Sequence, residues 1–72
     1  MAFRIEATTF NPEFDGPSKL VGTATTPARK VARVLCREFW RRGHWVEVFD
    51  ASTNELLAGP IDPDARYPSY TV

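Results

Sequence analysis

The segment Thr26–Gly43 constrains the fold more than any other part of this chain, because it carries both a helix start and a helix stop. Thr26 can accept the N–H groups of a first helical turn, and Pro27 suits the first helical position. Gly43 can adopt the left-handed conformation that closes a last turn. The segment therefore predicts a helix of about 16 residues over 27–42, roughly 24 Å long.

The two sides of this predicted helix differ in chemistry when residues are placed about 100° apart. The apolar stripe comprises Ala28, Val31, Ala32, Leu35 and Phe39. The opposite side comprises Arg29, Lys30, Arg33, Arg37 and Arg41. Trp40 lies at the border between them. We therefore expect one side to pack on a core and the other to face outward.

Four strands are predicted around the helix. Residues 1–10 alternate apolar and polar side chains, and residues 20–25 are short and rich in β-branched residues. Residues 44–50 give the strongest strand signal, with Val46 and Val48 on one face. A turn in which Asn54 can take the left-handed conformation leads to a fourth strand over 55–59, which Pro60 is expected to stop.

The predicted fold class is α+β, in the order β-β-α-β-β: a four-stranded, mainly antiparallel sheet with one helix packed on one face. A chain of 72 residues forms one domain, with an ordered core over about 1–60 and an extended, proline-containing tail over 61–72. The expected core residues are Phe3, Ile5, Leu20, Val31, Leu35, Phe39, Val46, Val48 and Leu57. With a single Cys, no signal peptide and no bilayer-length apolar run, we expect a soluble cytoplasmic protein.

Charge is distributed unevenly, although the formal net charge is zero. Six of the nine Lys and Arg residues lie within 27–42 against one acid, so this segment is +5 and the remainder is −5. The basic side of the helix, with Trp40 at its edge, is therefore a candidate partner-binding surface. Its partner would be an acidic protein surface or the phosphates of nucleic acid; the alternative is a solvated face with no partner. Trp40 can stack on a base there or simply cover the rim of the core.

The sheet face away from the helix is a second candidate surface. Trp45 and Phe49 should point to that side, where they can stack nucleotides, contact a second copy, or lie beneath Tyr67 and Tyr70 of the tail. The dimer is favoured, because a small core gains from added burial.

Catalytic, metal and cofactor chemistry finds little support in the sequence. Cys36 and His44 are unique, with Asp50 as a third candidate member, but Cys36 flanks the apolar stripe and His44 follows a chain reversal. Asp62 and Asp64 are more typical of a turn than of a cation site. We therefore expect no enzyme, no catalytic residue, no metal and no cofactor.

These observations favour a small non-enzymatic binding module that docks its basic helix face on an acidic protein surface, with phosphate binding to nucleic acid as the alternative. The −5 remainder of the chain disfavours a long polyanion. The order β-β-α-β-β resembles that of small phage and plasmid proteins that act by binding, some CRISPR inhibitors among them. This resemblance of element order implies an inhibitor or regulator.

Overall fold

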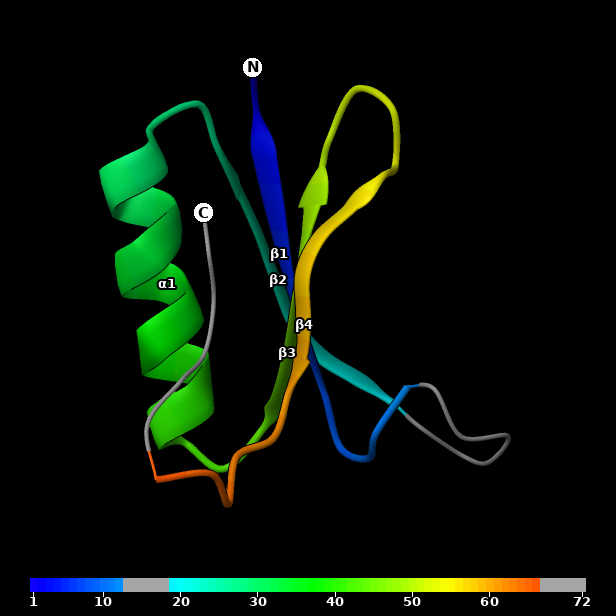
Figure 1. The fold of residues 1–72 in the computed structure, drawn as a ribbon, viewed down its shortest axis with the longest axis vertical. Coiled ribbons are helices and arrows are strands. Elements are labelled where there is room, and N and C mark those ends of the chain that lie inside the picture. The colour runs from blue at the N-terminus through cyan, green and yellow to red at the C-terminus, as the bar shows by residue number, and fades with distance from the viewer. Residues whose placement is uncertain (13–18, 67–72) are drawn as a thin grey trace.

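One antiparallel sheet and one helix make up the fold in the computed structural model, which describes residues 1–12 and 19–66 (Figure 1). The strands are β1 (Phe3–Thr8), β2 (Leu20–Thr26), β3 (Trp45–Asp50) and β4 (Leu56–Ile61), and the helix is α1 (Arg29–Arg41). The predicted fold class and element order are confirmed. Tyr67 and Tyr70 lie outside the described residues, as does half of the predicted tail, residues 67–72.

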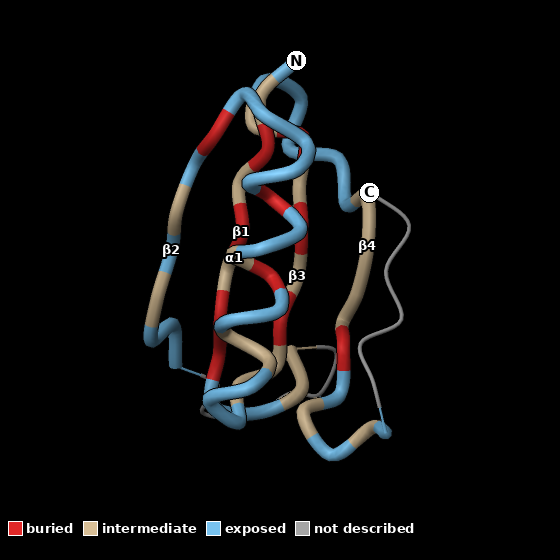
Figure 2. The backbone as a smooth tube through the Cα atoms, turned by 90° about the vertical axis from the view of Figure 1, so that its left-hand side faces the viewer, coloured by how far each residue is buried: buried red, intermediate tan, exposed pale blue. Residues whose placement is uncertain are grey.

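The sheet has the strand order β2-β1-β3-β4, and every neighbouring pair is antiparallel. The first strand in the sequence is therefore a central strand of the sheet. Figure 2 shows α1 in front of β1 and β3, with β2 to one side. The helix thus covers the two central strands on one face of the sheet, and the edge strand β2 lies beside it.

The core lies between α1 and the inner side of the two central strands. Alternation within β1 and β3 directs Phe3, Ile5, Val46 and Val48 to this side. The buried cluster consists of Phe3, Ile5, Ala32, Cys36, Val46, Val48 and Ile61. Leu35, Phe39, Trp40, Leu57 and Ala58 pack around it and stay partly exposed.

The helix begins two residues later than the sequence predicts. Thr26 is the last residue of β2, where it pairs with Phe3, because the residue before a proline disfavours the helical conformation. Its hydroxyl accepts a hydrogen bond from the backbone N–H of Ala28, at 3.1 Å. Ala28 is then the N-cap residue and makes no side-chain cap.

The helix ends at Arg41, one residue before the predicted end, and Gly43 closes it as predicted. Gly43 has a φ of 87° and donates its N–H to the carbonyl of Trp40, while His44 donates to the carbonyl of Phe39. These two bonds form a Schellman motif, which requires the left-handed conformation that glycine adopts without steric cost.

Two residues predicted for the core are exposed. Val31 keeps 45% of its surface, because the helix is rotated so that Ala32 and Cys36, rather than Val31, face the sheet. Leu20 keeps 50%, because the β1–β2 register shifts between Ala7 and Thr8 and places Leu20 opposite Thr8, whose position belongs to the outer side.

Pro60 does not stop the fourth strand, which continues to the buried Ile61, so the ordered core extends beyond residue 60. Proline is tolerated there because β4 is an edge strand with irregular pairing to β3, and an edge residue can lack an N–H donor. Asn54 has a φ of 62°, as its place in the β3–β4 turn predicts.

Candidate functional site

The outward side of α1 carries a row of four exposed side chains that we term the basic stripe: Lys30, Val34, Arg37 and Arg41. Their spacing of i, i+4, i+7 and i+11 places them within about 60° of arc on a helix. This arc lies opposite Ala32 and Cys36, the two helix residues that are buried. The stripe is about 16 Å long, so it presents an elongated surface rather than a pocket.

Val34 is the member of the stripe that the sequence analysis did not assign to either side. It keeps 59% of its surface exposed, although it is apolar and stands between cations. Val31 is exposed on the neighbouring side of the helix. The signal for Val34 was available in the sequence: it lies four residues after Lys30 and three before Arg37, which is the spacing of one helix face.

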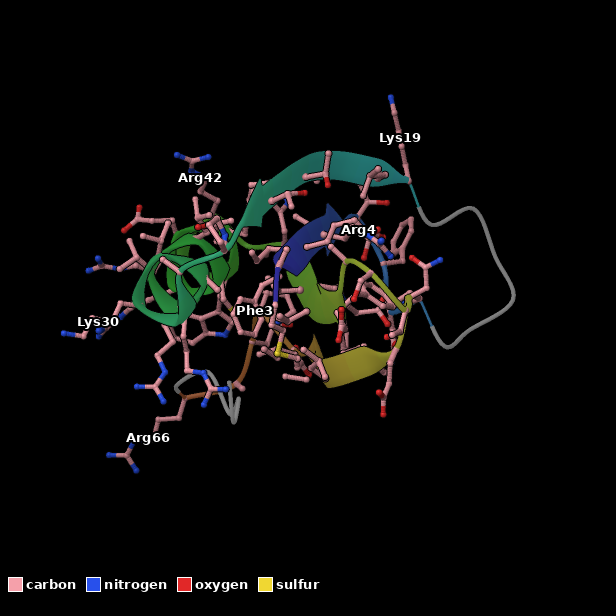
Figure 3. The ribbon with its side chains drawn as sticks, turned by 90° about the horizontal axis from the view of Figure 1, so that it is seen from above. Phe3, Arg4, Lys19, Lys30, Arg42 and Arg66 are labelled. Atoms are coloured by element: carbon pink, nitrogen blue, oxygen red, sulfur yellow. The ribbon has the colours of Figure 1, made fainter. Side chains whose placement is uncertain are left out.

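The predicted basic residues do not all point the same way. Arg29 is exposed, but its guanidinium lies 5.8 Å from the centre of the Phe3 ring, so it leans toward the core rather than joining the stripe. Arg33 is exposed at the border of the stripe. In Figure 3, Lys30 projects from α1 away from the sheet, and Arg42 and Arg66 project to either side of the helix.

Trp40 packs against the core at the end of the helix. Its indole N–H donates a hydrogen bond to the backbone carbonyl of Asp62, 2.9 Å away. The ring therefore covers the core rim and joins the helix to the chain that follows β4. Both cation–π contacts among the described residues are made by other rings, those of Phe3 and Phe49.

The cations of the basic stripe are not neutralised by the described part of the chain. Within residues 1–12 and 19–66, the side chains of Lys30, Arg37 and Arg41 make no ion pair and no hydrogen bond. Like charges three and four residues apart on a helix repel by a few tenths of a kcal/mol per pair. An external anionic group would remove this repulsion.

The outer sheet face presents Trp45 and Phe49 away from the helix, as predicted. Both are half-buried, while their neighbours Val46 and Val48 are fully buried on the inner side. Phe49 faces Arg4 across the β1–β3 ladder, and the guanidinium of Arg4 lies 4.7 Å from its ring centre. Arg4 also binds Glu6 at 2.7 Å and the side-chain oxygen of Asn54 at 2.7 Å. A fixed, partly covered cation therefore shields this ring.

No catalytic triad forms from Cys36, His44 and Asp50. Cys36 is fully buried under the helix, and burial raises the pKa of its thiol to about 11, so at neutral pH it is not a thiolate nucleophile. Asp50 ends β3 while His44 precedes its start, which places them roughly 20 Å apart along an extended strand. Asp50 instead accepts hydrogen bonds from the hydroxyl and N–H of Ser52, which lower its pKa.

The acids after β4 form a turn, as expected. Asp62 accepts the backbone N–H of Asp64 on its side chain, at 2.8 Å, and the N–H of Ala65 on its carbonyl. Within the described ranges, no three His, Cys, Asp or Glu residues cluster in a way that could hold a metal ion.

Comparison with protein families, with curated proteins and with solved structures finds no match to this chain. Among the described residues there is no helix with the length and apolar character needed to cross a membrane.

Proposed function

We propose that this protein is a non-enzymatic binding module whose basic stripe docks on an acidic surface of a protein partner. The stripe is the outward side of the only helix in the described part of the chain, so binding there leaves the core undisturbed. Arg29 and Trp40, which the sequence also suggested as contacts, are engaged with the core instead. The contact residues are therefore Lys30, Val34, Arg37 and Arg41, with Arg33 at the border.

The exposure of Val34 between three cations is the observation that carries this proposal. Protein interfaces combine an apolar centre with arginine, whereas lysine and arginine alone suffice for phosphates. With Val31 exposed beside it, Val34 gives the stripe an apolar element that a protein partner can desolvate. This mixture favours a protein over nucleic acid.

The distribution of charge supports the same choice. Glu6 and Glu47 lie on the outer sheet face, and Glu55 is exposed in the loop that precedes β4, whereas the helix carries one acid, Glu38. The first three belong to the part of the chain outside residues 27–42, whose net charge of −5 repels a long polyanion. A local acidic surface, including one shaped to receive nucleic acid, would meet only the stripe. Occupying such a surface would make the protein an inhibitor or regulator, acting in the cytoplasm.

Nucleic acid is the second candidate function, and the observation that favours it is the spacing of Lys30, Arg37 and Arg41 along about 16 Å without internal carboxylate partners. Such a row can contact several phosphates without reading bases. A prediction separates the two functions: log affinity for a mixed-sequence DNA duplex should fall against log salt with a slope of roughly −3 to −4.5 for three to five contacts. A titration at several salt concentrations measures this slope, and micromolar binding at physiological salt would refute the preference for protein.

Variants of the stripe test the proposal directly. Arg37→Glu should abolish capture of the partner from a native lysate treated with nuclease, because it reverses a central charge. Lys19→Glu is the matched control: it makes the same change of charge at an exposed residue on the far side of the molecule (Figure 3). Val34→Ser should weaken capture severalfold if the partner is a protein and leave it unchanged if the contacts are phosphates. Unchanged capture of the partner by a folded Arg37→Glu variant would contradict the proposal.

A further inference from the structure

Within residues 1–12 and 19–66, the outer edge of β2 pairs with no other strand, and the proposed function does not use this edge. The strand order leaves β2 and β4 at the two edges of the sheet. Natural proteins protect edge strands with charges, prolines and bulges, because a flat neutral edge pairs with other strands. β4 is protected in this way by Pro60 and by two register shifts. β2 (LVGTATT) contains neither a charged residue nor a proline, and its only register shift lies at its first residues.

The hydrogen bonds of β1 show which groups of β2 point outward. The N–H of Ala51 donates to the carbonyl of Ala2, which extends the β1–β3 ladder by one bonded pair. Bonded pairs alternate in an antiparallel ladder. The backbone groups of Arg4 and Glu6 therefore bond to β3, and those of Ile5, which lies between them, bond to β2. Ile5 therefore bonds to its partner Ala24. It follows that Thr23 and Thr25 present their N–H and C=O groups to the free edge.

We propose that β2 pairs in an antiparallel manner with β2 of a second copy of this chain, about a two-fold axis at Ala24. In this arrangement Thr23 of each copy faces Thr25 of the other, and each such pair exchanges both backbone hydrogen bonds. Ala24 faces its own counterpart on the helix side of the sheet. The two four-stranded sheets then become one continuous sheet.

A second copy fits this edge because the strand is complementary to itself. Cross-strand threonine pairs are favourable, and no charge meets its own image across the axis. The two helices lie on the same side of the joined sheet, but each stands over β1 and β3 rather than over β2 (Figure 2). They are then four strand spacings apart, roughly 19 Å, which exceeds the Debye length of about 8 Å at physiological salt. Repulsion between the basic stripes does not oppose the pairing.

The outer sheet face is less suited to a second copy than the β2 edge. Arg4, Glu6 and Glu47 lie at its centre, and a face-to-face dimer would have to desolvate all three with their counterparts. Phe49 is already shielded by Arg4. The dimer through Trp45 and Phe49 that the sequence suggested is therefore the competing outcome of the test rather than the proposal.

Solution mass tests the pairing on the full chain. Sedimentation of the wild type should show a mass rising from 8.1 kDa toward twice that value as concentration increases to the high micromolar range. Thr23→Pro removes one outward N–H and leaves the ladder with β1 intact, so this variant should stay monomeric while circular dichroism reports a folded chain. Thr23→Lys, which places like charges near the axis and faces Glu6 within its own chain, should also stay monomeric and decides the matter if the proline variant fails to fold.

Matched variants locate the interface. Thr53→Lys makes the same substitution at an exposed residue in the β3–β4 loop and should dimerise as the wild type does. Leu56→Lys alters the outer sheet face beside Phe49 and should also dimerise. A wild type that stays monomeric over the whole range, or a dimer lost in Leu56→Lys but kept in both Thr23 variants, would overturn the proposal.

A cysteine at the axis tests the register. Ala24→Cys in a Cys36→Ser background should form a disulfide-linked dimer under mild oxidation, because directly opposed residues of a non-bonded pair have Cα atoms about 4.5 Å apart. Thr53→Cys in the same background is the control and should remain largely unlinked. Equal linking of the two variants would overturn the axis at Ala24. None of these measurements requires the partner of the basic stripe, so they stand or fall independently of the proposed function.

Discussion

Gly22 carries no side chain at the point where the ring of Phe39 crosses β2. A Cβ atom added at Gly22 would lie 2.6 Å from the Cε1 atom of Phe39, well inside van der Waals contact. The helix and the strand approach each other closely because this atom is missing. Small residues act in the same way on the helix, where Ala32 and Cys36 are the two that are buried.

Gly22→Ala should therefore lower the free energy of unfolding by about 1–3 kcal/mol, the usual cost of overpacking. Urea denaturation measures it. Phe39→Leu replaces the ring with a smaller side chain, so the double variant should lose less stability than the sum of the two single variants. Strict additivity would mean that the two residues do not touch.

The acidity of the Cys36 thiol provides a test of the burial of this residue beneath the helix. Burial raises its thiol pKa to about 11, so the folded protein retains this proton at pH values where the unfolded chain, near its ordinary pKa of about 8.5, has lost it. The contribution of Cys36 to the free energy of unfolding should therefore be constant below about pH 8.5. It should fall as the pH rises from about 8.5 toward 11.

The same burial predicts slow alkylation. At pH 8 the native protein should react with a maleimide or iodoacetamide far more slowly than the urea-unfolded chain, since reaction requires opening of the helix. The ratio of the two rates, followed by mass spectrometry, measures this protection. Equal rates would place Cys36 at the surface and contradict the helix orientation.

At the scale of the elements, the sequence predicted the presence of every strand and of the helix, because each has its own pattern of apolar and polar residues. The alternation of β3 identified its inner face, and Gly43 identified the helix end. What the sequence could not supply was the rotation of the helix, which turns Ala32 and Cys36 rather than Val31 toward the sheet. That rotation depends on close approach to the sheet, which small residues such as Ala32 allow and which hydrophobicity alone does not reveal.

The candidate site was predictable to a similar degree. The outward cations Lys30, Arg37 and Arg41 followed from helical spacing alone. The same spacing also places Val34 among them, although the sequence analysis assigned it to neither side. The position of Arg29 beside Phe3 did not follow from spacing, because it depends on the rotation just described. Pro60 was misleading for a related reason: its effect depends on whether a strand lies at an edge, and strand order is a property of the whole sheet.

A matched pair of valine substitutions tests the rotation. Val48→Ala removes two methyl groups from a fully buried position and should cost about 1.5–3 kcal/mol of unfolding free energy. Val31→Ala removes the same atoms from an exposed position. It should change the free energy of unfolding by less than about 0.5 kcal/mol, because the better helix propensity of alanine partly offsets the small loss of burial. Thermal or urea denaturation compares them. Similar large losses of unfolding free energy in both variants would mean that Val31 is buried in the core.

At the scale of the whole molecule, β1 is the strand that joins β2 to β3 and packs beneath the helix. It pairs with β2 on one side and with β3 on the other, and its inner side chains lie under the helix. Residues from the start of the sequence are thus in register with residues more than forty positions away, as Phe3 is with Asp50. Because of this non-local pairing, we expect the sheet and the helix to unfold as one cooperative unit.

Ile5→Ala should therefore destabilise the entire fold. Ile5 is fully buried in this central strand, and its truncation should cost about 2–5 kcal/mol. A domain of this size has a total stability of roughly 4–11 kcal/mol, so the loss is a large fraction of it. Far-ultraviolet circular dichroism and tryptophan fluorescence should show a single coincident transition. Separate transitions for sheet and helix would contradict a shared core.

The outward stripe and the core use different residues of the same helix, and this has an evolutionary consequence. Only Ala32 and Cys36 of its thirteen residues are fully buried, and the stripe contributes nothing to the described core. Mutations at Lys30, Val34, Arg37 and Arg41 are then nearly free of selection for folding. Under the proposed function, selection at these four positions comes from the partner, so the specificity of the stripe can change on an unchanged scaffold.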